Sequence, residues 1–584
     1  MGNIFNGINI GMSSLKAQRK SLDTTGHNIA NADNEDYSRQ KAVHTAKKAY
    51  PFPGMNMPDT AGQKGNGVKV SQIKRIRDDF IDKQIREEGQ SLSQWEKRSE
   101  GLERIELILN EPSDSGLSEE MNQFWESLQD LSNNPEDSAA RSTVQQRAES
   151  LAGSFNSLDK NLEEYKQTLN SDLDSSVEEV NSLTRRIADL NKQISRIEAS
   201  GENKANDLMD KRNALYKELN QKVNVQGRMT DNNQLNISLG GINVVSGEKN
   251  ENLYVDQQQG SEEKFEDQVR FESTDNPVDI NNGEMDGIMT IRDDTIDKYR
   301  EQLGQMAHSF AERFNEVHQQ GYDANGEPGG EFFSIPDIDS DNEEYYKVAR
   351  DIDVNDDIMD DGGRIAAGNH SDEPRVATVL DEDISQESER NYHLEIVENE
   401  GGSSDYTYTI TETLGGEEIK SYEGQVDEGQ EINTADIPET GEDFVYHDDD
   451  YYTEDSFDGE FTFTARGTGE ANISLLDSPG SGNNATALGR VIKDEEIING
   501  ETTVMEAFES TVSELGVEGE RAQQMVKNQE DMVDQLENRQ ESVSSVSLDE
   551  EMANLMKYQQ TYNASAQMIS TTNQMMDSLF QILR

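Results

Sequence analysis

The stretch that decides the fold lies near the C-terminal end and reads LDEEMANLMKYQQTYNASAQMISTTNQMMDSLFQIL, residues 548–583. No Pro or Gly occurs from Ser542 onward. An apolar or aromatic side chain returns at every seventh position, at Leu548, Leu555, Tyr562, Ile569, Met576 and Leu583. This repeat predicts one long helix from residue 542 to the end, with a narrow seam for another helix.

A second position of the repeat, four residues after the first, is half polar. It is occupied by Met552, Gln559, Ala566, Asn573 and Phe580. The pattern therefore does not predict a simple two-stranded zipper. Because an isolated helix is marginally stable, the seam still requires a partner.

The N-terminal end offers a candidate partner with the same spacing. Apolar side chains recur at strict sevens at Ile8, Leu15, Leu22 and Ile29, with Ile4 and Met12 beside them. One interpretation is a helical hairpin within an ordinary bundle. The other is that the two chain ends pair and form the contact surface of an assembly.

The charge distribution favours the assembly. The chain has 52 Lys and Arg against 118 Asp and Glu, a net charge of −66, yet residues 1–34 and 553–584 each carry a net charge of only +1. Juxtaposed like charges repel, so a surface that meets other subunits cannot be densely acidic.

The acidic composition of the whole chain also argues against nucleic acid and anionic membranes as partners, and it suggests a high-salt environment with a halophilic acidic surface.

Other features narrow the function classes. The sequence contains no Cys, which excludes disulfides and thiolate chemistry. No apolar run approaches the length of a membrane span, and the N-terminal residues do not resemble a cleaved secretory signal. The absence of Cys suits an exported protein but does not by itself establish export.

The middle of the chain predicts an elongated helical region with a small β region. An extended or loop stretch is expected over 41–77, with a strand at 66–76, and the 223–291 stretch alternates as short strands. Helices are expected at 78–112, 115–132, 138–220 with a break near Gly201, 293–319, and 502–541 with interruptions at Gly516 and Gly519.

Residues 331–480 differ in kind, with 43 acidic residues against seven basic ones. The segments 392–398, 405–413 and 459–467 alternate like antiparallel strands with one wet face. They predict an inserted outer all-β domain, and the alternative is a disordered acidic linker. The fold class is thus α+β and multi-domain, with terminal coiled-coil helices, a helical bundle rod domain and this insert. The expected domains are a terminal assembly helix (1–40) that pairs with a second one (545–584), a rod domain (41–335) and its return helix (481–544), and the inserted acidic β domain (336–480).

Several motifs resemble the axial proteins of the bacterial flagellum, and most closely the hook-associated protein 1 family. LDTTGHNIANADNEDYSRQ (22–40) is similar to the N-terminal signature, in which NIAN is shared by rod, hook and junction proteins and YSRQ is more particular. The helix quoted above is similar to the shared C-terminal signature. Other similar stretches lie at 111–141, 205–215, 321–335 and 482–488.

The resemblance implies a structural protein that leaves the cell by type III export and supports motility from an extracellular position in the flagellum. Members assemble as a ring between hook and filament, and they contact the hook protein, the second junction protein and an export chaperone. The expected assembly interface comprises Asn28, Asn31, Tyr37 and Arg39 of the motifs, together with the N-terminal and C-terminal seam residues.

One position of the N-terminal motif departs from the family pattern. The family usually has Gly before the Tyr of YSRQ, whereas this chain has Asp36, with Asn34 where Thr is usual. If that position needs a positive φ, Asp tolerates it less well than Gly. The sequence therefore predicts a modified turn.

No pattern indicates an enzyme, a cofactor or a metal site. HExxH, GxSxG and P-loop motifs are absent, and His308 and His318 are expected on the polar face of their helix. The run Asp351, Asp353, Asn355, Asp357 begins like an EF-hand loop but lacks its Gly and final Glu. Two alternatives stay open: another rod or hook axial protein, and a secreted adhesin-like binding protein carried by the acidic insert.

Overall fold

The computed structural model describes most of the chain. It covers residues 2–48, 65–109, 113, 116–199, 204–256, 268–325, 327–338, 344–368, 390–398, 406–414, 417–426, 431–433, 444–446, 462–464, 469–473, 482–495, 497–498 and 502–582. The chain divides into two compact units. Unit 1 is Met1–Ile108, Leu162–Lys298 and Ser513–Arg584, and unit 2 is Leu109–Asn161 and Tyr299–Val512.

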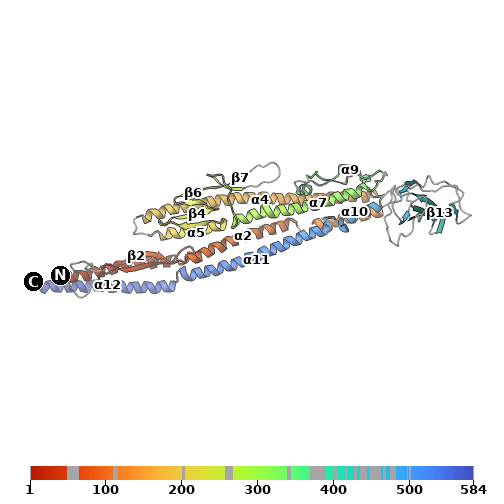
Figure 1. Cartoon of the computed structure of the whole chain (residues 1–584). Coiled ribbons are helices and arrows are strands. Elements are labelled where there is room, and N and C mark those ends of the chain that lie inside the picture. The colour runs from red at the N-terminus through yellow and green to blue at the C-terminus, as the bar shows by residue number, and fades with distance from the viewer. Residues whose placement is uncertain are drawn as a thin grey trace. The chain divides into compact units, whose positions relative to one another are not determined.

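The protein is mostly helical, with small antiparallel sheets (Figure 1). Within the described ranges, no helix is long and apolar enough to cross a membrane. The helices are α1 (Gly2–Ala30), α2 (Asp79–Leu109), α3 (Leu117–Asn133), α4 (Ser138–Glu198), α5 (Asn206–Lys222), α6 (Glu284–Met289), η1 (Thr290–Thr295), α7 (Ile296–Gln319), α8 (Tyr346–Asp351), α9 (Asp356–Asp360), η2 (Gly362–Arg364), α10 (Asn483–Lys493), α11 (Val504–Ser544) and α12 (Leu548–Ile582).

The helical predictions hold in outline and fail at two places. The break predicted near Gly201 separates α4 from α5, but α11 continues through Gly516 and Gly519 without interruption. The single helix predicted from residue 542 is wrong, because α11 ends at Ser544 and α12 begins at Leu548. At this break the main-chain N–H of Arg39 donates to Ser544 O at 3.0 Å, and the N–H of Glu551 donates to Ser547 O at 2.9 Å.

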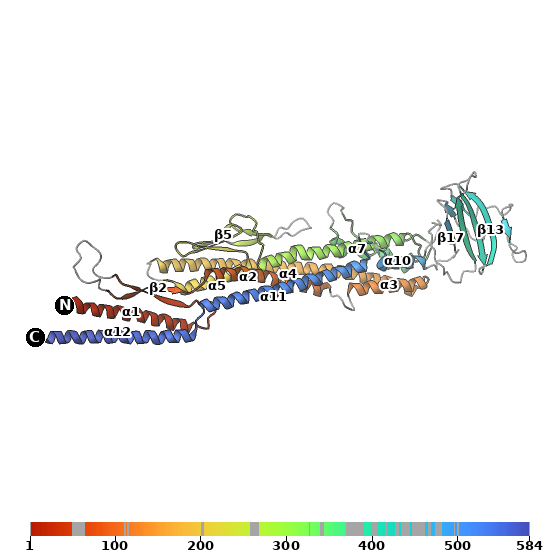
Figure 2. The same ribbon diagram turned by 60° about the horizontal axis from the view of Figure 1, so that its bottom comes forward.

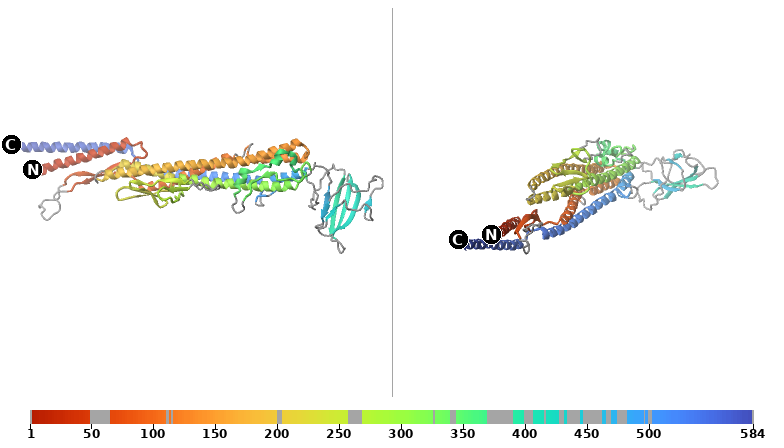
Figure 3. Two further views of the ribbon diagram at one scale, coloured as in Figure 1. Left: turned by 90° about the horizontal axis from the view of Figure 1, so that it is seen from above. Right: turned by 60° about the vertical axis from the view of Figure 1, so that its left-hand side comes forward.

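Helix α1 of unit 1 has two neighbours. On one side it lies along α12, with the N and C ends of the chain close together in every view (Figures 1–3). On another side it contacts the antiparallel hairpin of β1 (Gln40–Ala46) and β2 (Val68–Arg75). The predicted strand at 66–76 is confirmed as β2, whereas β1 was not predicted as a strand.

The remaining strands of unit 1 lie where period-two alternation was predicted, between residues 223 and 291. Four of them form an antiparallel sheet in the order β3 (Gln226–Met229), β4 (Leu235–Leu239), β5 (Ile242–Ser246) and β6 (Lys249–Asn250), and β7 (Leu253–Asp256) pairs with β8 (Gln268–Phe271). Buried Asn191 of α4 donates to Leu235 O and Gly247 O at 2.8 Å each. The side chain of Asn181 donates to Leu253 O and accepts from the Leu253 N–H, at 2.8 Å each. Amides along α4 therefore complete the main-chain hydrogen bonds of the strands.

Unit 2 has an aromatic core. The rings of Phe124 on α3, Phe310 and Phe314 on α7, and Phe332 and Phe333 beside β9 (Phe333–Ser334) meet with centroid separations of 4.9–6.5 Å. Strand β9 pairs with β10 (Asp353–Val354). Aromatic clusters of this kind contribute beyond the area they bury, so they fix the packing of α3 on α7.

The prediction for His318 is wrong. Its side chain is fully buried, with Nδ1 2.8 Å from Gly330 O and Nε2 accepting from the Ala366 N–H at 2.9 Å. These contacts assign the proton to Nδ1. Burial lowers the pKa of His318 to about 4, so the ring is neutral.

The strands of the acidic segment form two antiparallel sheets. The larger has the order β15 (Phe444–Tyr446), β13 (Glu417–Val426), β12 (Tyr406–Leu414), β11 (Arg390–Glu398) and β17 (Gly469–Ile473), and β14 (Glu431–Asn433) pairs with β16 (Thr462–Thr464) (Figure 2). The strands predicted at 392–398 and 405–413 correspond to β11 and β12. Most of 459–467 lies outside the described residues.

Candidate assembly interface

Small residues let α1 and α12 approach closely. A Cβ atom built on Gly11 would lie 2.6 Å from Ile569 Cγ1, and one built on Gly7 would lie 3.5 Å from Thr572 Cγ2. The hydroxyls of Ser14 and Ser565 are 2.7 Å apart. The two helices therefore pack through glycines and hydroxyls rather than through interlocking large side chains.

The side of α12 that this packing buries differs from the predicted second seam position. Glu551, Ser565 and Thr572 are buried, at 2–8 % exposure. Met552, Gln559, Ala566 and Asn573 are all exposed. The buried series lies three residues after the apolar one, not four, and it was missed because a polar series gives no hydrophobic period.

The predicted seam residues follow the α1–α12 contact without being buried by it. Half-buried positions are Ile8, Leu15, Leu22, Ile29, Leu555, Ile569 and Met576. Leu548 is 51 % exposed and Tyr562 is 37 % exposed. Leu583 lies outside the described residues. Much of the predicted apolar seam is thus left uncovered in the single chain.

Asn28 is the centre of a buried polar network at the end of α1. Its side-chain oxygen accepts from the Tyr37 hydroxyl at 2.8 Å and from the Gln40 N–H at 3.0 Å. Its amide nitrogen donates to Gln40 O at 2.9 Å and to Glu551 Oε2 at 3.1 Å. All four amide hydrogen-bonding positions are used, so the motif side chain fixes the path of the chain from α1 into β1.

Arg39 joins the same corner to α12. Its guanidinium lies 2.9 Å from Glu551 Oε1 through Nε and 2.7 Å from Glu550 Oε2 through Nη2. The side chain of Glu551 is 3 % exposed, whereas that of Glu550 is 62 % exposed. Tyr37 is buried next to these groups, and burial together with Asp207, Asp210 and Glu551 raises the pKa of its hydroxyl, which therefore stays protonated. Asn31, by contrast, follows the last residue of α1, and its side chain donates to His27 O of that helix at 2.9 Å.

The motif also contacts α5 through residues that were not predicted. Asp210 accepts from the Ser38 hydroxyl at 2.6 Å and from Arg75 at 2.8 Å, and Asp207 accepts from Gln40 at 2.9 Å. Both acids belong to the stretch 205–215 that resembles the family. Sequence similarity at two distant stretches was the available signal, but it does not state that they touch.

The turn before the motif does not require a positive φ. Among the described residues, the non-glycine residues with positive φ are Asn233 and Asp275, so Asp36 is not one of them. Instead, the Asp36 N–H donates to the Asn34 side chain at 3.2 Å and the Tyr37 N–H donates to Asn34 O at 3.0 Å. The Asn34 side chain thus forms an Asx turn with the Asp36 N–H, and this turn does not need a glycine.

Helix α12 also presents exposed thioethers. Met552, Met556, Met568 and Met575 are 44–56 % exposed. Flexible, polarizable Met side chains are common on surfaces that bind other proteins. Together with the uncovered seam, they give α12 an exposed apolar surface.

The EF-hand-like residues of the sequence belong to regular secondary structure. Asp351 ends α8, Asp353 lies in β10, and Asn355 caps α9 by accepting from the Asp357 N–H at 3.0 Å, so the EF-hand-like run spans three elements rather than one loop. Over the part of the chain that the structure describes, no group of three or more His, Asp or Glu side chains is placed to hold a metal ion.

Three family models match the chain. The flagellar hook-associated protein FlgK helical domain matches residues 102–333, the flagella basal body rod protein matches 8–37, and the flagellar basal body rod FlgEFG protein C-terminal matches 541–582. The two rod models therefore cover the helices that form the α1–α12 contact.

Named relatives extend the match to nearly the full length. Flagellar hook-associated protein 1 of Escherichia coli strain K12 is 29 % identical, over 98 % of this chain and 99 % of the relative. The protein of that name from Bacillus subtilis strain 168 is 26 % identical, over 99 % and 98 %. The flagellar hook junction protein FlgK from Burkholderia pseudomallei shares the fold, with a TM-score of 0.52 at 17 % identity over 79 % of this chain and 100 % of that one.

The family models and the relatives together support a structural role in the bacterial flagellum, and they define the class as a flagellar axial protein. Within that class, the chain is similar over nearly its full length to proteins named flagellar hook-associated protein 1.

Proposed function

We propose that this chain forms the junction between the flagellar hook and filament, as a ring of subunits joined by coiled-coil packing of α1 and α12. The observation that carries the proposal is the α1–α12 contact itself, which leaves exposed seam residues and four exposed Met side chains on α12. Such a surface gains hydrophobic stabilisation only when neighbouring chains cover it.

The proposal includes the partners and the route. Neighbours along the axis are the hook protein on one side and the second junction protein on the other, and an export chaperone covers the terminal helices before assembly. Export leaves the chain uncleaved and extracellular. The strand-rich acidic insert lies on the outside of the assembly, where a densely charged surface stays solvated.

Another rod or hook axial protein remains the alternative, since two of the matching models are named for rod proteins. The match of residues 102–333 to the FlgK helical domain favours the junction. An adhesin-like role gains no support from the relatives.

The terminal helices can be tested with exposed residues that do not hold the subunit together. Met556→Asp with Met575→Asp places charges at two positions that are 56 % exposed each. The double variant should fold and be exported but should not be incorporated between hook and filament, because a neighbouring chain would have to bury the new carboxylates. Electron microscopy of isolated flagella with a labelled antibody measures incorporation.

Gln560→Glu with Gln574→Glu is the matched control, since both glutamines are exposed polar residues of the same helix. Normal incorporation of the methionine variant would overturn the proposal. Presence of the wild-type protein elsewhere along the rod or hook would favour the alternative.

A further inference from the structure

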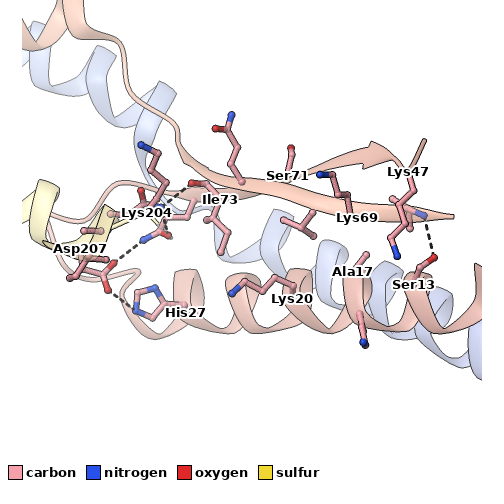
Figure 4. Close-up of a pocket in the computed structure, with 18 of the residues that line it drawn as sticks. Ser13, Ala17, Lys20, His27, Lys47, Lys69, Ser71, Ile73, Lys204 and Asp207 are labelled. Carbon is pink, nitrogen blue, oxygen red and sulfur yellow. Dashed lines mark hydrogen bonds and ion pairs between the residues drawn. The ribbon is translucent and has the colours of Figure 1, made fainter. Parts of the chain in front are cut away.

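A basic groove lies beside α1 in unit 1. It has a volume of about 540 Å³ and is bounded by α1, the β1–β2 hairpin and the residues that begin α5 (Figure 4). Its ionisable lining consists of Lys16, Lys20, His27, Lys47, Lys69, Lys204 and Asp207. One carboxylate therefore faces five lysines, in a chain whose net charge is −66.

Four of these lysines lack a counter-charge. Within the described residues, Lys16, Lys20, Lys47 and Lys69 are exposed and have no carboxylate within 4.0 Å. Some lysines on other elements of the same unit do have such partners, namely Lys97, Lys166, Lys217, Lys222 and Lys298. The groove lysines are thus unpaired although the chain has a large surplus of acids.

The sequence around the groove also carries a net positive charge. Residues 1–77 hold 12 basic and five acidic residues, a net charge of +7, and the rest of the chain holds 40 basic and 113 acidic residues. Lysines gathered around one groove repel each other, and an anionic partner that enters the groove relieves this repulsion.

We propose that the groove receives a carboxylate-bearing segment of a second copy of this chain, an inference that rests on the proposed self-assembly. Charge complementarity supports this occupant, because the rest of each copy holds 113 acidic residues against 40 basic ones. The exposed methionines of α12 lie in the same unit and mark it as a region that meets other chains.

The test uses isolated flagella and a carbodiimide, which joins a lysine amine to a carboxylate without a spacer. Wild-type chains should give a covalent dimer on a denaturing gel. Mass spectrometry of that dimer should find Lys16, Lys20 or Lys69 linked to an Asp or Glu peptide of this same chain. Raising the salt concentration before the reaction should lower the yield, since screening weakens the contact.

Variants of the groove lysines separate the effect of their positive charge from their ability to form the cross-link. Lys16→Glu with Lys20→Glu and Lys69→Glu should lower the amount of the chain in isolated flagella, whereas arginine at these positions should keep incorporation and lose the cross-link. The matched control reverses the charge of Lys211, Lys249 and Lys527, which are exposed, are not part of the groove and have no carboxylate within 4.0 Å among the described residues. It should incorporate normally.

The two proposals fail differently. Absence of the wild-type chain from the junction overturns the proposed function and this inference with it. A chain that is present at the junction but gives no groove cross-link to another copy overturns the inference alone. Cross-links from the groove lysines to the hook protein or another flagellar protein also overturn it, because they identify a different occupant.

Discussion

Arg39 Nε lies 2.9 Å from Glu551 Oε1, so an ion pair joins residues that are 512 positions apart in the chain. The pair lies where α11 gives way to α12, and Asn28 shares the same carboxylate at 3.1 Å. It connects the two motif-bearing ends within a single chain.

Removal of this carboxylate should destabilise the corner strongly. Glu551→Ala leaves Arg39 and Asn28 without their buried acceptor, and breaking a buried ion pair costs about 3–5 kcal/mol. Hydrogen exchange should therefore accelerate in the amides of residues 28–46 and 548–558. Glu550→Ala removes the exposed acceptor of the same arginine and should cost at most about 1 kcal/mol. Equal effects of the two variants would contradict the role given to Glu551.

The close approach of α1 and α12 can be tested at two glycines of α1. Gly11→Leu should push the helices apart, since its Cβ alone would lie 2.6 Å from Ile569 Cγ1. Gly26→Leu meets no atom within 4 Å at Cβ and should stabilise the helix by about 0.5–1 kcal/mol through propensity alone. Disulfide formation between Ser14→Cys and Ser565→Cys reports the pairing, because the chain has no other cysteine. Rapid oxidation in the Gly11→Leu background would argue against this packing.

Acid should destabilise unit 2 through His318. The pKa of this histidine is lowered to about 4 by burial, below its usual 6.5, so the unfolded chain binds an extra proton between these values. The stabilising contribution is fully present above pH 6.5 and falls as the pH drops toward 4, by at most about 3 kcal/mol. His318→Gln should flatten the pH dependence of the unfolding free energy in that window. His308→Gln, on the same helix but with 24 % of its side chain exposed, is the control.

The acidic surface should make stability depend on salt. The Debye length is about 30 Å at 0.01 M salt and about 3 Å at 1 M, so repulsion among the acids of residues 331–480 is strongest in dilute buffer. The melting temperature should rise from dilute buffer to molar KCl. A flat response would count against a halophilic surface.

The strand-rich insert should be dispensable for the flagellar axis. Deletion of residues 376–478 removes much of the acidic excess but none of α1, α12 or the motif network. Filament attachment should survive, as measured by electron microscopy, and the salt dependence of the melting temperature should decrease. Loss of attachment in a folded deletion variant would assign the insert a role in the axis.

The sequence by itself determined the helices that carry long apolar periods, the strands that alternate, and the resemblance to flagellar axial proteins. Hydrophobic periodicity and sequence motifs depend only on residues that are close together in the sequence, so α12, β2 and the break after α4 could be predicted. Only the tertiary structure decided which polar residues meet. Glu551, Ser565 and Thr572 face α1, Asp210 holds Ser38, and His318 is buried. Polar side chains carry no hydrophobic period, and their partners lie tens to hundreds of residues away, so their roles follow from packing that no local pattern encodes.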